Sequence, residues 1–464
     1  MSTLGQKPAT THVSTEKQSI TGNGGTSYTL QQSVSQASDI EVFVNNTRQE
    51  PTVAYTASGT TLTMTGAVNS SDSFYVIFQG KAIQTAGLPV DAAITASTIT
   101  TSQTITSTGN ITTSGTVNTP SINGGQIGGR RNIVINGAMQ VAQRGSVTFD
   151  HAATGTANLY GLDRFQFQSA ALDQLEGTIT QVADAPVGFT NSLKWTTTEP
   201  ESAIAANETF DCCQKIEAQD LQQLAFGTSS AKKLTLRFYV KSSVTGTYGI
   251  NIFKADSTAR QLTSTYAISS ANTWEEKTIT IPADTDSSGT IANDNGEGLR
   301  ITWHLGTGSD FTSADTALTW TDYANAGWAF GHAQNGVATT DNATWQLTGV
   351  QLEVGSQATP FEHRSFAEEQ QLCFRYCRKF TTLNFGRARD GDSFYGGAVH
   401  FSPPMRATPT LSDATYTNNT GNVGTPSINS GQGPSADSIQ LYNSGSSWTA
   451  NSFPKLTGIF AAEL

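Results

Sequence analysis

The sequence has little charge, little cysteine and no long apolar run, and each shortage excludes a class of protein. Only 14% of its 464 residues are charged, and 26 basic residues face 37 acidic ones. This balance excludes a basic nucleic-acid-binding protein. Four cysteines, two of them adjacent, do not make a disulfide framework and favour synthesis in a reducing cytoplasm. The first residues resemble no secretory signal and no run reaches the roughly 18 apolar residues of a membrane span, so we expect no membrane insertion.

Glycine, serine and threonine are abundant, and this composition favours strands and turns over helices. At roughly 100–200 residues per domain, the length predicts three or four units. The first is a small N-terminal β-sandwich within residues 1–88. Its strands are expected at 39–44, 60–65 and 74–78, which are separated by Asn-, Ser- and Gly-rich turns.

Residues 89–130 have a different pattern, which predicts a short intertwined trimeric shaft. Between 92 and 129 there is no charged, histidine or aromatic residue, and single aliphatic residues recur every five or six positions. A lone ribbon cannot bury these side chains, whereas three chains around one axis supply both a core and partners for the strand edges. A flexible Thr/Ser linker is the alternative. The expected shaft core is Ile94, Ile99, Ile105, Ile111, Val117, Ile122 and Ile127.

Residues 131–362 predict a jelly-roll β-sandwich, because strand-like segments recur with turn signals between them. The segment 130–137 is expected to be a strand that ends in an Asn-Gly turn. The alternation in 274–281 predicts a strand with one solvated face. The other expected strands are 234–240, 248–253, 299–305 and 345–354.

A helix is predicted within residues 363–380. Ser365 and Glu368 form a capping-box pattern, and no glycine or proline interrupts the segment from 366 to 380. Its apolar residues are expected on one face, where they would pack against other copies of the chain. This trimerisation face consists of Phe366, Cys373, Tyr376, Cys377 and Phe380.

No motif in the sequence marks a catalytic or cofactor site. The six histidines show neither HExxH spacing nor a GxSxG context, so we expect no enzyme and no cofactor. Cys373 and Cys377 could contribute to a metal site, but burial in a core needs no further ligands and is favoured. A structural calcium ion near Asp163, Asp211 or Glu353 is a minor hypothesis without an assigned ligand set.

Residues 381–464 are expected to form a distal receptor-binding β domain. This segment combines Tyr and Trp with Ser, Gly and Asn and carries few charges toward its end, a composition that suits binding by stacking and neutral hydrogen bonds. The candidate receptor-binding residues are Tyr395, Tyr416, Tyr442, Asn443 and Trp448.

Several segments resemble tail fibre proteins of bacteriophages. The most specific are 131–145 (RNIVINGAMQVAQRG) with 162–165 (LDRF), and the stretch 351–369, which contains QLEVG, TPFE and RSFAEE. Residues 404–410 (PMRATPT) are similar to the start of the tip segment, and 39–51 (DIEVFVNNTRQEP) resembles attachment modules. Together these segments extend over most of the chain.

The resemblance implies a homotrimeric virion fibre that is made in the host cytoplasm. Its N-terminal module would attach to the phage tail, baseplate or an adaptor protein. Its carbohydrate-binding-like jelly roll and distal tip would face a host-surface glycan or lipopolysaccharide. Two alternatives stay open: a virion polysaccharide depolymerase, and a structural connector that does not adsorb to cells.

Overall fold

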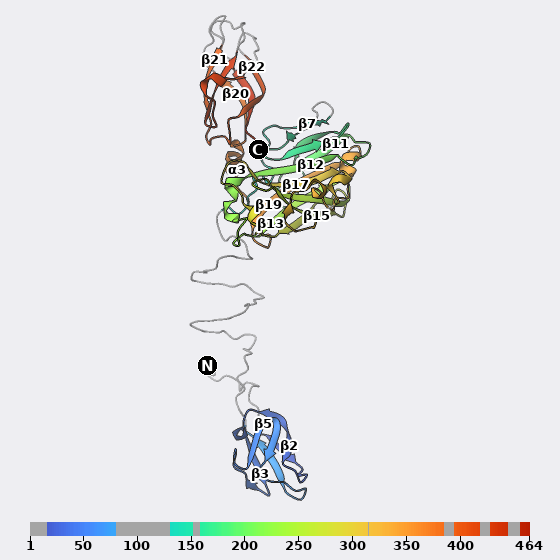
Figure 1. The fold of residues 1–464 in the computed structure, drawn as a ribbon, viewed down its shortest axis with the longest axis vertical. Helices are drawn as coiled ribbons and strands as arrows, with labels where there is room; N and C mark the ends of the chain where they lie inside the picture. The colour runs from blue at the N-terminus through green and yellow to red at the C-terminus, as the bar shows by residue number, and fades with distance from the viewer. Residues whose placement is uncertain are drawn as a thin grey trace, which may run out of the picture. The chain divides into compact units, whose positions relative to one another are not determined.

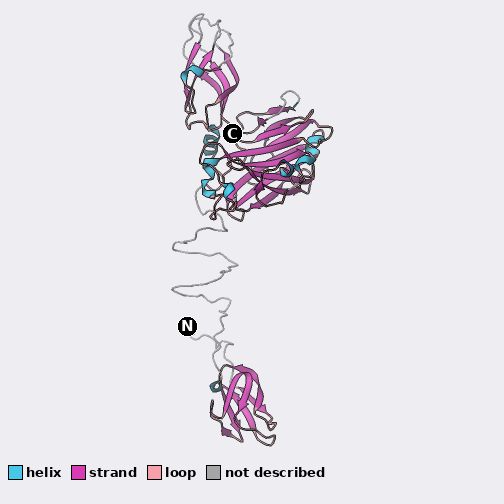
Figure 2. Ribbon diagram, in the orientation of Figure 1, coloured by secondary structure: helices cyan, strands magenta, loops and turns pink. Residues whose placement is uncertain are grey.

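Antiparallel strands make up most of the regular structure in the described residues, which confirms the mainly β fold class (Figure 2). The computed structural model describes residues 16–79, 130–151, 158–313, 315–384, 394–417, 427–443 and 455–464. The chain divides into two compact units, Met1–Thr113 and Ser114–Leu464. The predicted shaft core, from Ile94 to Ile127, lies outside the described residues.

The described part of the first unit, residues 16–79, is a two-sheet sandwich. Its apolar residues alternate along the strands, as in β5, so that one face of each sheet enters a shared core. Tyr55 is fully buried, and its hydroxyl donates to the backbone oxygens of Ala37 and Ile40. The strands predicted at 39–44, 60–65 and 74–78 are present. The sheets are β1 (Glu16–Ile20), β6 (Phe74–Phe78), β3 (Ile40–Val44) and β4 (Thr47–Arg48), and β2 (Ser27–Val34) with β5 (Tyr55–Met64).

The second unit contains a large β-sandwich, seen between β7 and β13 in Figure 1. Its two sheets enclose one core, in which Trp195, Trp303 and Trp345 are fully buried. The six-stranded sheet runs in the order β16 (Glu275–Ile281), β13 (Leu234–Ser242), β19 (Thr344–Val354), β11 (Ser192–Glu199), β10 (Glu176–Val182), β7 (Val147–Asp150). The seven-stranded sheet runs β18 (Thr321–Asp322), β15 (Arg260–Ile268), β14 (Gly246–Lys254), β17 (Glu297–Thr307), β12 (Thr209–Glu217), β9 (Gln166–Ala170), β8 (Asn158–Tyr160).

Five strands predicted for this sandwich are present as β13, β14, β16, β17 and β19. The prediction of a strand at 130–137 is wrong. Side chains from distant residues, and not a neighbouring strand, form many of the hydrogen bonds to the backbone of this segment. Glu362 accepts from the backbone of Asn132, and Gln214 bonds both the N–H and the C=O of Ile135. The Asn-Gly turn is present: Asn136 has φ 61°, and its carbonyl accepts from Met139 N at 2.9 Å.

The helix α3 (Phe366–Phe374) begins as predicted but is shorter. Ser365 is its N-cap, and its side chain accepts from Glu368 N at 3.3 Å. The helix ends at Phe374, and the chain continues as strand β20 (Cys377–Asn384), so the prediction of a helix to Phe380 is wrong. The backbone of Cys377 is satisfied by pairing with Ala461, which extends a sheet instead of the helix.

The distal β domain consists of two three-stranded sheets. Its core includes Phe401, Leu441 and Phe460, which are almost completely buried. One sheet runs β20, β25 (Lys455–Ala461), β22 (Thr410–Thr417), and the other runs β21 (Phe394–His400), β24 (Ser438–Asn443), β23 (Ser427–Ile428). No helix in the described ranges is long and apolar enough to cross a membrane.

Candidate functional site

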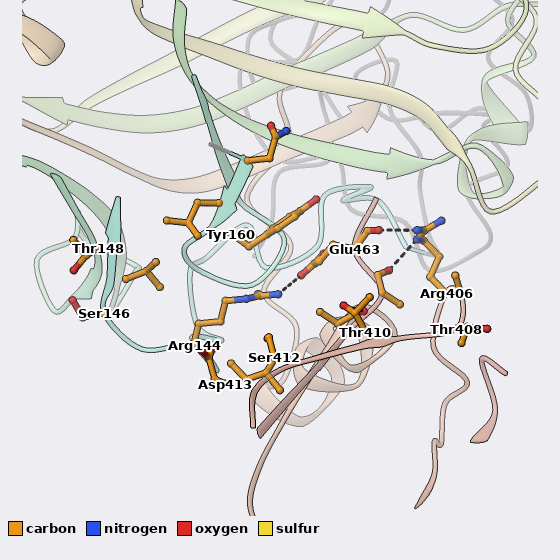
Figure 3. A pocket seen from close by; sticks show the side chains of 17 residues that line it. Arg144, Ser146, Thr148, Tyr160, Arg406, Thr408, Thr410, Ser412, Asp413 and Glu463 are labelled. Carbon is orange, nitrogen blue, oxygen red and sulfur yellow. Dashed lines mark hydrogen bonds and ion pairs between the residues drawn. The ribbon is translucent and has the colours of Figure 1, made fainter. Parts of the chain in front are cut away.

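A cleft lies where three sheet edges meet in the second unit (Figure 3). β7 is the edge strand of the six-stranded sheet, β8 is the edge of the seven-stranded sheet, and β22 is an edge of the distal domain. All three strands line the cleft, whose volume is about 780 Å³. Edge strands present backbone N–H and C=O groups that a ligand can pair with. A volume of this size suits a small molecule or a short oligomer.

Hydroxyl groups form the rim of the cleft. Ser146 directly precedes β7, and Thr148 lies on the solvent face of that strand. Thr408, Thr410 and Ser412 come from β22 and the segment before it. All five residues are exposed. A hydroxyl both donates and accepts, so this rim suits a ligand that is itself rich in neutral hydroxyls.

A bulge in β22 shapes the distal wall. The register between β22 and β25 shifts between Ser412 and Thr415, and Asp413 has φ 49°. A bulge bends its strand and changes the direction of the side chains within it. Thr410, Ser412 and Asp413 consequently all line the cleft, although strict alternation would send neighbouring side chains to opposite faces.

The interior of the cleft combines an aromatic ring with small apolar groups. The Tyr160 hydroxyl donates to the backbone oxygen of Leu464 at 2.9 Å, and the Arg144 guanidinium lies 5.3 Å from the ring centre. Burial raises the pKa of the Tyr160 phenol well above its ordinary value, so the hydroxyl stays neutral. The apolar lining is completed by Val147, Leu159, Ala407, Ile459, Ala461 and Ala462.

Glu463 joins the distal domain to the sandwich at the back of this cleft. One carboxylate oxygen accepts from Arg144 at 2.8 Å, and the other accepts from Arg164 at 2.7 Å. The Arg164 guanidinium is buried and lies 3.5 Å from the centre of the Tyr376 ring. Burial opposes the charge on Arg144, but Glu463 outweighs it and raises the arginine pKa. The Glu463 carboxylate therefore offsets part of the positive charge of two arginines inside the protein.

A second charged contact holds the end of α3. Arg375 bonds both oxygens of the Glu217 carboxylate, at 2.7 and 2.8 Å, and the Tyr376 hydroxyl donates to Glu217 at 2.5 Å. Burial disfavours the carboxylate, but these hydrogen bonds outweigh it and hold the pKa of Glu217 below its ordinary value. We call the contacts of Glu463 and Glu217 the arginine–glutamate joint.

The lining of the cleft is suited to recognition more than to catalysis. Asp413 and Glu463 are the carboxylates among the described lining residues. Both oxygens of Glu463 are already bonded to arginines, so this group is poorly placed to act as a general acid. Arg406 also has internal partners, the backbone oxygens of Ala462 and Glu463 (Figure 3). The groups left for a ligand are mainly hydroxyls and apolar surfaces.

The predicted receptor residues lie in the distal domain, but the structure describes only part of them. Tyr395 in β21 and Tyr442 in β24 are paired across two neighbouring strands, and Asn443 pairs with Phe394. Tyr416 in β22 lies opposite Leu456. Trp448 is outside the described residues. The described residues of this domain that line the cleft are at other positions.

The predicted trimerisation face is divided by the end of α3. Phe366 is exposed, with 54% of its surface accessible, whereas Cys373, Tyr376 and Cys377 are buried within the chain. Cys373 and Tyr376 share an apolar cluster with residues of the 130–145 segment, and Phe380 belongs to the core of the distal domain. The expectation that all five residues share one helix face is therefore wrong, because β20 begins at Cys377.

The carboxylates considered for calcium have protein partners. Asp163 accepts from the backbone and the side chain of Gln143, and Asp211 lies 2.6 Å from the His304 ring nitrogen. Glu353 accepts from Thr359. No group of three or more Asp, Glu, His or Cys residues is placed to hold a metal ion in the part of the chain that the structure describes.

No protein-family model matches the chain, and no curated protein matches it either. Among solved structures it is similar to a family 4 carbohydrate-binding module, at 12% identity over 47% of this chain and 97% of the module, with a TM-score of 0.23. A family 11 module from Clostridium thermocellum, in complex with a mixed-linked tetrasaccharide, is 12% identical over 46% of this chain and 98% of its own, with a TM-score of 0.24.

A tandem pair of family 22 modules from Paenibacillus barcinonensis is 9% identical over 74% of this chain and 99% of its own length, with a TM-score of 0.23. Scores this low support no inference about the ligand of this chain. The β-sandwich is established by its own strand pairing.

Proposed function

We propose that the chain is a subunit of a trimeric phage tail fibre that binds a glycan on the host surface, and that the cleft between the sandwich and the distal domain binds this glycan. The observation that carries the proposal is the convergence of three sheet edges and five exposed hydroxyl residues around an apolar floor. Sugars offer the matching surfaces, because their hydroxyls both donate and accept while their C–H faces are apolar.

The residues that resemble phage tail fibres also support the proposal through their positions. Arg144 belongs to the block 131–145, Arg164 to the block 162–165, and Arg406 to the block 404–410. Two of these arginines bond the Glu463 carboxylate and the third bonds its backbone oxygen. The resembling segments thus meet at the back of the cleft, although they are far apart in sequence.

Removal of two hydroxyls from opposite walls tests the role of the cleft. Thr148→Val and Ser412→Ala, combined in the full chain, keep the wall shape and remove one hydroxyl each. A lost hydrogen bond costs about 1 kcal/mol, so we expect the Kd for immobilised bacterial lipopolysaccharide or capsular polysaccharide to rise about 30-fold. Biolayer interferometry against a panel of these polysaccharides measures the change.

Thr278→Val is the matched control, because Thr278 is an exposed strand residue on β16, outside the cleft. It should bind like the unmodified chain. Unchanged binding by the double variant would move the site away from the cleft, and the distal loops with Trp448 would then be tested by Trp448→Ala. Release of new reducing ends from the polysaccharide would favour the depolymerase alternative over a binding protein.

Assembly and attachment are further parts of the proposal. We expect the full chain to sediment as a trimer through 92–129, and a stable monomer at micromolar concentration would contradict this. Three copies of a weak site raise the apparent affinity for a multivalent surface by about 10²–10⁴. The N-terminal module is proposed to bind the tail, so the chain from Arg130 onward should still bind polysaccharide.

A further inference from the structure

Four aromatic rings gather on the outer face of the six-stranded sheet, away from the sandwich core. Phe189 comes from the loop between β10 and β11, Tyr239 from β13, and Phe361 and His363 from the segment after β19. The Phe189 ring centre lies 5.6 Å from Tyr239, 4.9 Å from Phe361 and 5.4 Å from His363. We call these four residues the ring platform.

A glycine in β19 allows the rings to approach the sheet. Gly349 has φ 61°, and a Cβ at this position would lie 2.8 Å from both the Phe189 and the Tyr239 ring. No larger residue could stand there without moving the rings. The platform is therefore a built feature of the sheet, yet its rings stay partly exposed, and Val187 in the same loop is fully exposed.

Polar groups border the platform on one side. The Tyr239 hydroxyl donates to Glu276 at 2.6 Å, and Arg237 donates to both Tyr239 and Glu276, at 2.8 and 2.9 Å. Arg237 also donates to the Thr359 backbone oxygen at 3.2 Å. The Arg237–Glu276 pair is neutral overall, and Glu276 is 42% exposed, so its carboxylate can still accept hydrogen bonds from a ligand.

The geometry points to a second sugar-binding site at the ring platform, which takes a neutral pyranose. The rings stack against the apolar C–H face of the sugar, and the hydroxyls at its edge bond Glu276 and Arg237. The four residues of the ring platform, together with Arg237 and Glu276, line a cavity of about 440 Å³, which has room for one or two sugar units. Partly exposed rings beside a few fixed polar groups are the usual composition of such a site.

Saturation-transfer NMR on the full chain tests this site. The probes are methyl β-D-glucopyranoside and methyl β-D-galactopyranoside, with glycerol as a polyol that has no stacking face. We expect transfer to a pyranoside but not to glycerol. Phe189→Leu keeps the apolar volume and removes the ring, and Glu276→Gln keeps the shape and removes the charge. Each should weaken binding at least tenfold without lowering the melting temperature.

Tyr323→Ala is the control, because Tyr323 is an exposed ring that packs against Phe253 and Trp328 outside the platform. It should keep the full signal. The cleft variant Thr148→Val/Ser412→Ala should keep it as well, so that failure of the platform and failure of the cleft are distinguishable. Equal transfer in Phe189→Leu would overturn the proposal. The proposal would also be overturned if the unmodified chain showed no transfer and Phe189→Leu sedimented more slowly. That result would indicate that this face is a contact between copies of the chain.

Discussion

The large sandwich and the distal β domain are built from the same kind of strand but are stabilised differently. Among the described residues, the sandwich encloses one continuous core of 40 buried apolar residues, whereas the distal domain encloses eight. A domain with so small a core gains little from burial alone. Its position against the sandwich rests on the charged contacts of Glu463 and Glu217, together with a small apolar cluster that contains Cys373 and Tyr376. One region therefore relies mainly on packing, and the other mainly on a buried electrostatic joint.

The largest effect is expected from a change in the sandwich core. Trp195 is fully buried, and its ring lies 4.6 Å from Phe210 and 5.5 Å from Phe149. Trp195→Ala removes these contacts and leaves a cavity, so we expect a loss of about 3–5 kcal/mol in the free energy of unfolding. Urea denaturation followed by far-UV circular dichroism measures it. A loss below about 1 kcal/mol would contradict a tightly packed core.

A slightly smaller effect is expected from the joint. Arg164→Met keeps the bulk of the side chain but removes one of the two arginine partners of Glu463. Because Arg144 remains, we expect a loss at the low end of the about 3–5 kcal/mol that breaking a buried ion pair costs. We expect the distal domain to become sensitive to protease while the sandwich stays intact. Glu463→Gln should increase protease sensitivity further than Arg164→Met, because it leaves both Arg144 and Arg164 without their carboxylate. If Glu463→Gln were as resistant to protease as the unmodified chain, this would count against an electrostatic joint.

The joint should also respond to pH, through Glu217. Its pKa is lowered in the folded chain, so the stabilisation is present above the ordinary value of 4.5 and is lost as the pH falls through the lower folded value. Melting temperature between pH 6 and pH 3 should decline less steeply in Glu217→Gln than in the unmodified chain. Parallel curves would show that Glu217 does not contribute to acid sensitivity.

The smallest effect is expected for an ion pair on the surface. Arg48 lies 3.0 Å from Glu41 in the N-terminal module, but its side chain is 58% exposed. Exposed pairs contribute about 0–1 kcal/mol, so Arg48→Ala should shift the melting temperature of this module very little. If Arg48→Ala lowered the melting temperature as much as Arg164→Met does, exposed and buried ion pairs would contribute equally to stability, contrary to this prediction.

Regular alternation made much of the fold predictable. Residues 234–240 and 274–281 alternate apolar and polar side chains, and both are strands. The segment 130–137 has the same apolar character but is no strand, because Glu362 and Gln214 bond its backbone from distant positions. No local pattern reveals such partners.

The same limit applies to the site. Arg144 and Glu463 meet at the back of the cleft although 319 positions separate them. The end of α3 depends on a distant segment in the same way: the sequence after Phe374 still suits a helix, but pairing of Cys377 with Ala461 favours a strand. Contacts between distant segments therefore determine where the helix ends and the strand begins, because local propensity alone is compatible with either structure.

The return of β25 beside β20 has a mechanical consequence. The chain enters the distal domain at Cys377 and leaves it at Ala461, and these two residues are direct partners in the sheet. Ala462 N also donates to the Tyr376 oxygen at 2.8 Å. A force on the distal domain is thus shared between β20 and β25. The ion pair of Arg375 with Glu217 lies next to the start of β20, and the ion pairs of Glu463 lie next to the end of β25. We expect both sets of ion pairs to be loaded together when the domain is pulled away from the sandwich.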